Sequence, residues 1–109
     1  MSSFDEAKSL KLYNLANVEG ETDVEVALNL IADPVVDVNY LPPGTDNRTP
    51  LRQACCCNHF KIVEALLKHP NVLMNKCGPE ETTPLYMASQ DGHEAAVKLL
   101  LNHPNIDVN

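Results

Sequence analysis

Apolar residues recur with a helical period in the second half of the chain. Ile62, Val63, Leu66 and Leu67 fall at positions i, i+1, i+4 and i+5, which places them along one face of a helix. Pro70 follows three residues after Leu67, and the residue before a proline is disfavoured in the helical conformation. The pattern therefore predicts an amphipathic helix that ends before Pro70.

The pattern belongs to an internal repeat. Residues 49–75 align without a gap with residues 83–109, at an offset of 34, and share Thr-Pro-Leu at the start and His-Pro-Asn near the end. Residues 27–39 match residues 97–109 at an offset of 70, so a third and more divergent copy precedes the other two. Terminal repeats are expected to diverge because one of their faces meets water. We expect one domain of three units, at about residues 1–41, 42–75 and 76–109.

Helix-start and helix-stop signals predict a pair of helices in each unit. Thr49 and Thr83 stand at N-cap positions and are each followed by a proline, which is favoured at the first helical position because it needs no N–H donor there. The first helix is expected to end near Asn58 in one unit and Gly92 in the other, since both residue types tolerate a left-handed backbone.

The first unit has start signals of another kind. "SFDE" at residues 3–6 and "TDVE" at residues 22–25 have the pattern of capping boxes. They predict helices that begin near residues 4 and 23.

The repeated unit resembles the ankyrin repeat. "TPLYMASQDGHEAAVKLLL", closed by "DVN", carries nearly all of that family's pattern: the Thr-Pro-Leu start, the Gly-His turn, the Val-x-x-Leu-Leu second helix and the Asp-Val-Asn close. The resemblance covers almost the whole chain. It implies an all-α solenoid of stacked antiparallel helix pairs joined by β-hairpin-like loops.

The chain also departs from that family's pattern. Arg52 and Tyr86 stand where the family has a histidine after Thr-Pro-Leu, and Asn47 and Glu81 stand where it has a glycine at the hairpin tip. Asparagine adopts the conformation of that glycine readily, whereas glutamate does not, so we expect the second tip to be distorted.

Charge and hydropathy exclude several classes of partner. The chain has 15 acidic residues against 8 Lys and Arg, a net charge of −7, and its basic residues are scattered singly. Binding of nucleic acid needs a basic patch to neutralise phosphates, so we expect none, and an electrostatically recognised partner is expected to be basic. No stretch reaches the roughly 18 apolar residues that a membrane helix requires, and the N-terminus is not a signal peptide. These features predict a cytoplasmic location without membrane contact.

Three adjacent cysteines in "TPLRQACCCNHF", residues 49–60, invite a metal or redox hypothesis. Neighbouring side chains on a helix point about 100° apart, so Cys55, Cys56 and Cys57 cannot converge on one ion as spaced zinc ligands do. We interpret Cys55 as a packing residue and the other two as thiols at the exposed end of the first helix. A metal- or redox-responsive protein stays as the least favoured alternative.

The remaining candidates for chemistry have structural interpretations. The histidines form two repeat-related pairs, His59 with His93 and His69 with His103, and are expected to cap helix ends or to hydrogen-bond the turns. Asn39, which closes its unit as Asn75 and Asn109 do, is expected to fix the return loop. No nucleophile motif, phosphate-binding loop or metalloprotease motif occurs. We therefore predict no catalytic residue, no metal and no cofactor.

The favoured function is a non-catalytic module that binds a partner protein. The resemblance implies contacts through the hairpin tips and the concave face of the first helices, with Tyr40, Leu41 and Tyr86 as apolar anchors. The residues at these positions are Tyr40, Leu41, Thr45, Asp46, Arg48, Arg52, Cys56, Cys57, Pro79, Glu80, Thr82, Tyr86, Gln90 and Asp91.

The last unit lacks the polar outer face expected of a terminal repeat, because residues 93–109 are as apolar as an internal unit. We therefore expect either a longer array beyond residue 109 or self-association through this unit. The second functional hypothesis is that the chain is the targeting or substrate-recruiting segment of a larger multidomain protein, such as an enzyme or a secreted effector.

Overall fold

Six helices make up the regular structure of the described part of the chain. The computed structural model describes residues 4–45, 47–78 and 82–106. The helices are α1 (Glu6–Ala16), α2 (Val24–Ala32), α3 (Pro50–Cys56), α4 (Phe60–Leu67), α5 (Pro84–Gln90) and α6 (Glu94–Leu101). Each odd-numbered helix packs against the even-numbered helix that follows it, so the predicted helix pairs are confirmed. No helix in these ranges is long and apolar enough to cross a membrane.

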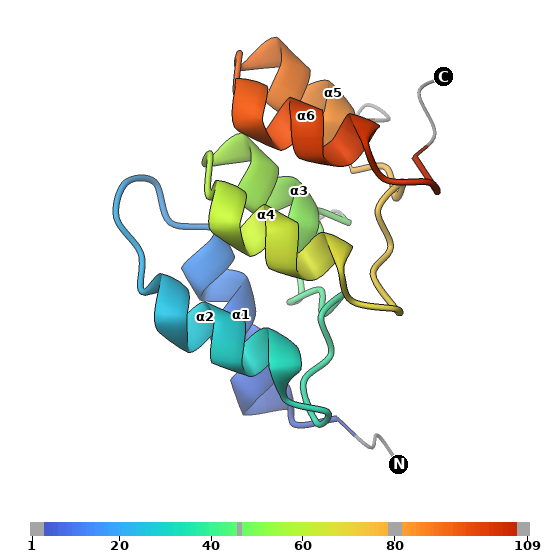
Figure 1. Ribbon diagram of the computed structural model, residues 1–109. Coiled ribbons are helices and arrows are strands. Elements are labelled where there is room, and N and C mark those ends of the chain that lie inside the picture. The colour runs from blue at the N-terminus through green and yellow to red at the C-terminus, as the bar shows by residue number, and fades with distance from the viewer. Residues whose placement is uncertain (1–3, 46, 79–81, 107–109) are drawn as a thin grey trace.

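The pairs stack into two layers. Helices α1, α3 and α5 contact one another in sequence and form the inner layer, while α2, α4 and α6 form the outer layer (Figure 1). No strand occurs among the described residues, and the loops before α3 and α5 project from one side of the stack. In the second of these loops the backbone N–H of Gly78 donates to the carbonyl of Thr82 at 2.7 Å. Among the described residues these loops contain no strand, and this bond joins the two sides of the second loop.

Both Thr-Pro starts form helix caps as predicted. The hydroxyls of Thr49 and Thr83 accept the backbone N–H groups of Arg52 and Tyr86, each at 3.1 Å. Each bond satisfies an N–H group that has no partner within its own helix.

The starts predicted in the first unit are displaced. The carboxylates of Asp5 and Asp23 are the N-caps, and α1 and α2 begin one residue later, at Glu6 and Val24. The hydroxyl of Thr22 donates instead to the carbonyl of Leu15 at 2.8 Å. Aspartate is as favourable an N-cap as serine or threonine, and in both helices the aspartate that follows one or two residues after the motif's first residue is the cap.

Left-handed residues lie at the predicted turns. Asn58 has φ 61° and Gly92 has φ 72°, each immediately before the histidine that precedes the second helix of its unit. Asn47 has φ 64° at the tip of the loop before α3. The corresponding Glu81 lies outside the described residues.

The core runs along the stack between the two layers. The predicted stripe of α4 is buried, and it belongs to one core cluster to which all six helices contribute apolar side chains. The largest fully buried apolar side chains are Leu12, Leu51, Ile62, Val63, Leu66 and Leu100. Burial of one such side chain stabilises the fold by about 1.5–3 kcal/mol.

Histidine rings join each unit to the one before it. The Nε2 atom of His59 lies 2.5 Å from the carbonyl oxygen of Val18, and that of His93 lies 3.0 Å from the carbonyl oxygen of Cys56. His103 contacts the carbonyl of Leu67 in the same way, at 3.1 Å. A carbonyl oxygen only accepts, so Nε2 carries the proton in each ring. The structural role predicted for these three histidines is confirmed, although His59 and His93 make no side-chain bond as caps.

Asparagines join each unit to the one after it. Asn39 donates through Nδ2 to the carbonyl of Asn71 at 2.7 Å and accepts the N–H of Leu73 at 3.0 Å. Asn75 donates to the carbonyl of Asn105 at 2.8 Å. The expectation that these asparagines fix the return loops is confirmed for Asn39 and Asn75, while Asn109 lies outside the described residues.

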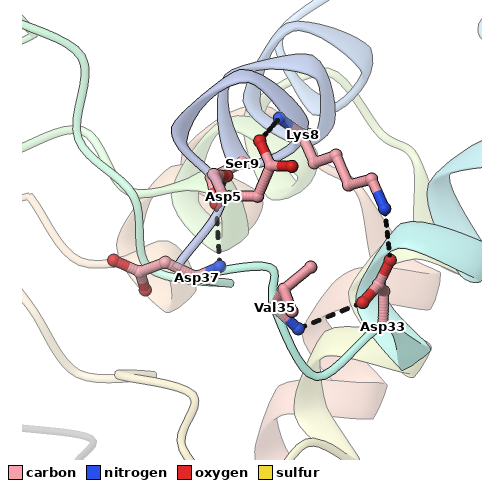
Figure 2. A network of polar contacts seen from close by, with 6 residues as sticks. All are labelled: Asp5, Lys8, Ser9, Asp33, Val35 and Asp37. Atoms are coloured by element: carbon pink, nitrogen blue, oxygen red, sulfur yellow. Dashed lines mark hydrogen bonds and ion pairs between the residues drawn. The ribbon is translucent and has the colours of Figure 1, made fainter. Parts of the chain in front are cut away.

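The first unit is closed by a polar network of its own (Figure 2). Lys8 donates to Asp33 at 3.1 Å, and no other ion pair occurs among the described residues. The hydroxyl of Ser9 donates to the carbonyl of Asp5 at 2.8 Å and accepts the N–H of Asp37, also at 2.8 Å. These contacts fasten the return loop after α2 to the start of α1.

Candidate partner-binding face

The inner-helix face is formed by side chains one helical turn apart on α3 and α5. Arg52 and Cys56 are four residues apart on α3, and Tyr86 and Gln90 are their equivalents on α5. Residues at this spacing lie on one face of a helix. Tyr13 on α1 is buried near Arg48 and Arg52, and burial raises the pKa of its phenol.

Arg52 is buried within this face. Its side chain is only 6 % exposed, because its guanidinium lies over the loop that leads to α5. Nε and one terminal nitrogen donate to the hydroxyl of Thr82 at 3.2 and 3.0 Å, and the other terminal nitrogen donates to Oε1 of Gln53 at 2.7 Å. A Cβ atom on Gly78 would come within 2.8 Å of Nε, so the glycine makes room for the guanidinium.

Burial and the neighbouring Arg48 lower the pKa of Arg52 below its ordinary value. The side chain nevertheless remains a cation, because an arginine does not lose its proton in a protein. Arg52 makes no ion pair with a carboxylate of the described residues. Its predicted role as a contact residue stays a prediction, and in this conformation it presents little surface to a partner.

A chain of side-chain hydrogen bonds crosses all three units beneath the face. Gln53 accepts from Arg52 and donates through Nε2 to the side-chain oxygen of Asn17, in the loop after α1. Through Arg52 the chain continues to Thr82, before α5. Every buried side-chain nitrogen and oxygen in the described residues has a hydrogen-bond partner, so the polar groups beneath the face are all hydrogen-bonded.

Neither Gln53 nor Asn17 was predicted from the sequence to contribute to this site. The alignment of the repeats could have identified Gln53, because its equivalent in the next unit is the apolar Met87. Asn17 has no such signal, since the loop after α1 does not align with the other units.

The cysteine cluster is divided by burial. Cys55 is fully buried in the core, which raises the pKa of its thiol far above the ordinary range and confirms the predicted packing role. Cys56 and Cys57 are half-buried at the end of α3, and burial also raises the pKa of both thiols. The thiol of Cys56 donates to Asp91 at 3.7 Å. These thiols are therefore poor nucleophiles, because the reactive form is the thiolate.

The acidic side chains around α3 add to this effect. Asp91 and Glu19 both raise the pKa of Cys56 and Cys57, so two carboxylates flank the end of the inner-helix face. Residues 4–45, 47–78 and 82–106 contain no group of three or more His, Cys, Asp or Glu side chains placed to hold a metal ion. All four cysteines are free thiols.

Of the predicted contact residues, those on α5 and Arg48 are open to solvent. Tyr86 is 52 % exposed, and Gln90, Asp91 and Arg48 are also exposed. The structure thus brings an aromatic side chain and polar groups of both charges to one side of the stack. Aromatic and arginine side chains are the types that most often dominate binding energy at interfaces.

The loop before α3 folds back on the first unit. Tyr40 and Leu41 are half-buried, and Tyr40 lines a hollow of about 290 Å³ with Phe4 and Glu6. Burial, followed by the neighbouring Glu6 carboxylate, raises the pKa of the Tyr40 phenol. The hydroxyl of Thr45 donates to a carbonyl of its own loop. The role of these residues as partner contacts stays a prediction.

Several predicted contacts lie outside the described residues or contribute to the fold. Asp46, Pro79 and Glu80 are outside the described ranges. Thr82 is described, and its hydroxyl accepts from Arg52, as shown above.

A comparison with protein-family models found one whose description is "Ankyrin repeats (3 copies)", and it matches residues 13–109. A search of curated proteins found no match.

Proposed function

Because the chain belongs to the ankyrin-repeat family, we propose that it is a non-catalytic module that binds a partner protein through its inner-helix face. Ankyrin repeats generally mediate protein–protein interaction and are typically non-catalytic. The proposal for this chain goes further, because it assigns the contact to Tyr86, Gln90, Asp91 and Arg48.

The observation that best supports this proposal is the exposed Tyr86, which lies beside a set of buried side-chain hydrogen bonds that are already formed. A half-exposed aromatic side chain can bury a large apolar area on binding while its hydroxyl finds a polar partner. The helix that holds it is fixed by a threonine cap and by the hydrogen bonds of Arg52 to the preceding loop. A contact surface that is already ordered has less conformational entropy to lose when it binds.

The charge near the face favours a partner with a basic surface. The chain carries a net charge of −7, and Glu19 and Asp91 flank the end of α3. Complementary charge speeds the encounter of two proteins and suppresses wrong partners. We place the interaction in the cytoplasm, where four free thiols are maintained by a reducing environment.

The test is affinity capture from the cell that expresses the protein, with the wild type and Tyr86→Ala side by side. The proposal expects a partner that the wild type retains and Tyr86→Ala loses. Leu73→Ala is the matched control, because it removes an exposed apolar side chain from the return loop after α4, away from both the inner-helix face and the outer layer of helices. A partner that is retained equally by both variants would remove the assignment to this face.

Self-association is a second candidate function, supported by the open side of the last unit. Leu101 is 50 % exposed, whereas its repeat equivalent Leu67 is 7 % exposed beneath the third unit. A second copy could cover the apolar side chain in the same way. Sedimentation velocity over a range of concentrations should then show a dimer that Leu101→Asp abolishes. A monomer at every concentration would exclude it.

A further inference from the structure

A hollow on the outer layer lies on the side opposite the inner-helix face. It has a volume of about 560 Å³ and runs across α2, α4 and α6, the three helices that form one layer in Figure 1. We call it the outer-helix groove. Its apolar lining comes from Leu28 on α2, Phe60 and Ala65 on α4, and Ala95 and Leu99 on α6.

The apolar lining is open to a ligand. Phe60 is 46 % exposed and Leu28 is 37 % exposed, so two large apolar side chains from neighbouring units meet solvent at one hollow. The small side chains Ala65 and Ala95 leave space between them. Single exposed apolar residues are ordinary, but a hollow lined by several of them is typical of an interaction site.

The groove has the opposite charge to the molecule. Lys61, Lys68 and Lys98 line it together with a single carboxylate, Glu64, although the chain as a whole carries −7. Four of the chain's eight cationic side chains follow residue 60, and three of these four line this hollow. None of the three makes an ion pair within residues 4–45, 47–78 and 82–106.

We propose that the outer-helix groove binds an acidic segment of another protein, one that carries leucine- or phenylalanine-like side chains between its carboxylates. The apolar side chains would fill the space beside Phe60 and Ala95, and the carboxylates would lie along Lys61 and Lys98. This surface is distinct from the inner-helix face and binds a ligand of the opposite charge.

A peptide suits the groove better than a nucleic acid does. Glu64 lies on the same face of α4 as Lys61 and Lys68, three and four residues away, and it would repel a phosphate that passes between them. The floor is apolar, whereas phosphate binding depends on a continuous run of cations. An acidic amphipathic peptide uses both the lysines and the apolar floor.

The experiment measures fluorescence anisotropy of a labelled helical peptide built from repeated Leu-Glu-Glu-Leu blocks, titrated with the full chain. We expect saturable binding that weakens as salt is raised, because the lysines are exposed. Lys98→Glu should raise Kd by about tenfold, since it replaces an attraction by a repulsion at the groove. Phe60→Ser should raise Kd by removing the apolar contact.

Lys11→Glu is the matched control, because it changes the net charge of the chain equally on an exposed position of α1. Circular dichroism checks that each variant is folded. Equal weakening by Lys98→Glu and Lys11→Glu would overturn the proposal, since only the overall charge would then matter. Equal affinity for a peptide in which alanine replaces every leucine would overturn it too, as would absence of binding.

Two further measurements distinguish the acidic peptide from other ligands of the groove. A single-stranded oligonucleotide that binds more tightly than the peptide and competes with it would overturn the proposal in favour of nucleic acid. Concentration-dependent sedimentation that Lys98→Glu abolishes would assign the groove to a second copy of the chain. A monomeric wild type that prefers the peptide supports the proposal.

Discussion

The second helices of the second and third units end in leucines at equivalent positions, yet those side chains meet different surroundings. Leu67 ends α4 and is 7 % exposed, whereas Leu101 ends α6 and is 50 % exposed. Helices α5 and α6 pack over the second unit, and α6 is the last helix of the described chain. The repeat pattern therefore determines which side of a helix is apolar, while the neighbouring unit determines whether that side is buried.

Arg52 and Tyr86 extend the contrast to a polar position. Both are the third residue after a capping threonine, but Arg52 is 6 % exposed and Tyr86 is 52 % exposed. The loop that contains Gly78 and Thr82 covers Arg52. The described residues contain no corresponding loop over Tyr86. Equivalent positions in a repeat can thus differ in role, one stabilising the stack and the other available to a partner.

The largest expected effect comes from truncating the two equivalent leucines. Leu67→Ala should lower the free energy of unfolding by about 2–3 kcal/mol, because it leaves a cavity between two units. Leu101→Ala should cost less than about 1 kcal/mol, since half of its side chain already meets water. Urea denaturation followed by circular dichroism measures both. Equal losses would mean that Leu101 is covered in solution, as self-association requires.

The next largest effect contrasts the contributions of Arg52 and Tyr86 to stability. Arg52→Ala should lower the free energy of unfolding by about 1–3 kcal/mol, because it removes a packed side chain and leaves Thr82 and Gln53 without this partner. Tyr86→Ala should change it by no more than about 0.5 kcal/mol. Thermal and urea unfolding of both variants provide the comparison.

Arg52→Lys is the informative control for this pair. It keeps the charge but loses the planar fork that reaches Thr82 and Gln53 at once, so its stability should lie between those of the wild type and Arg52→Ala. A stability equal to that of the wild type would show that charge alone matters at this position.

The elements of the second and third units were predictable because their signals are local. A capping threonine, the following proline and a left-handed Asn58 or Gly92 each act within a few residues, and all were found where the sequence places them. The starts of α1 and α2 were misplaced by one or two residues. There, the sequence offers two residue types that cap well within two positions of each other, and it does not show which of them is the N-cap.

The face was predictable only in outline. The burial of Arg52 depends on a loop that begins more than twenty residues later, and a local pattern contains no information on that contact. The outer-helix groove was not predicted either. Its lysines are scattered along the sequence, and they come together only because α4 and α6 pack side by side.

A smaller effect tests the two left-handed positions that precede α4 and α6. Gly92→Ala should cost about 1 kcal/mol, because an L-residue is strained at this φ. A Cβ atom there would meet no other atom within 4 Å, so the cost is conformational and not steric. Gly92→Asn should cost less, since the equivalent Asn58 already adopts this conformation. A neutral Gly92→Ala would show that the turn can rearrange.

The smallest effect concerns Asp33, which stands in the first unit where the other two units have His69 and His103. Each of these three side chains accepts the backbone N–H two residues later. The carboxylate of Asp33 also accepts from Lys8, whereas the imidazole of His103 donates through Nε2 to the carbonyl of Leu67.

The hydrogen bond from Val35 and the pairing with Lys8 lower the pKa of Asp33 below its usual value of 3.8. The folded state then binds this proton less readily than the unfolded state does, so the stability due to Asp33 is present above 3.8 and is lost as the pH falls through the folded pKa. Between about pH 5 and pH 2.5, the melting temperature of the wild type should fall more steeply than that of Asp33→Asn. The other carboxylates are common to both proteins, so the difference between the two curves isolates Asp33. Parallel curves would mean that neither the Val35 hydrogen bond nor the Lys8 pairing favours the ionised form of Asp33 in solution.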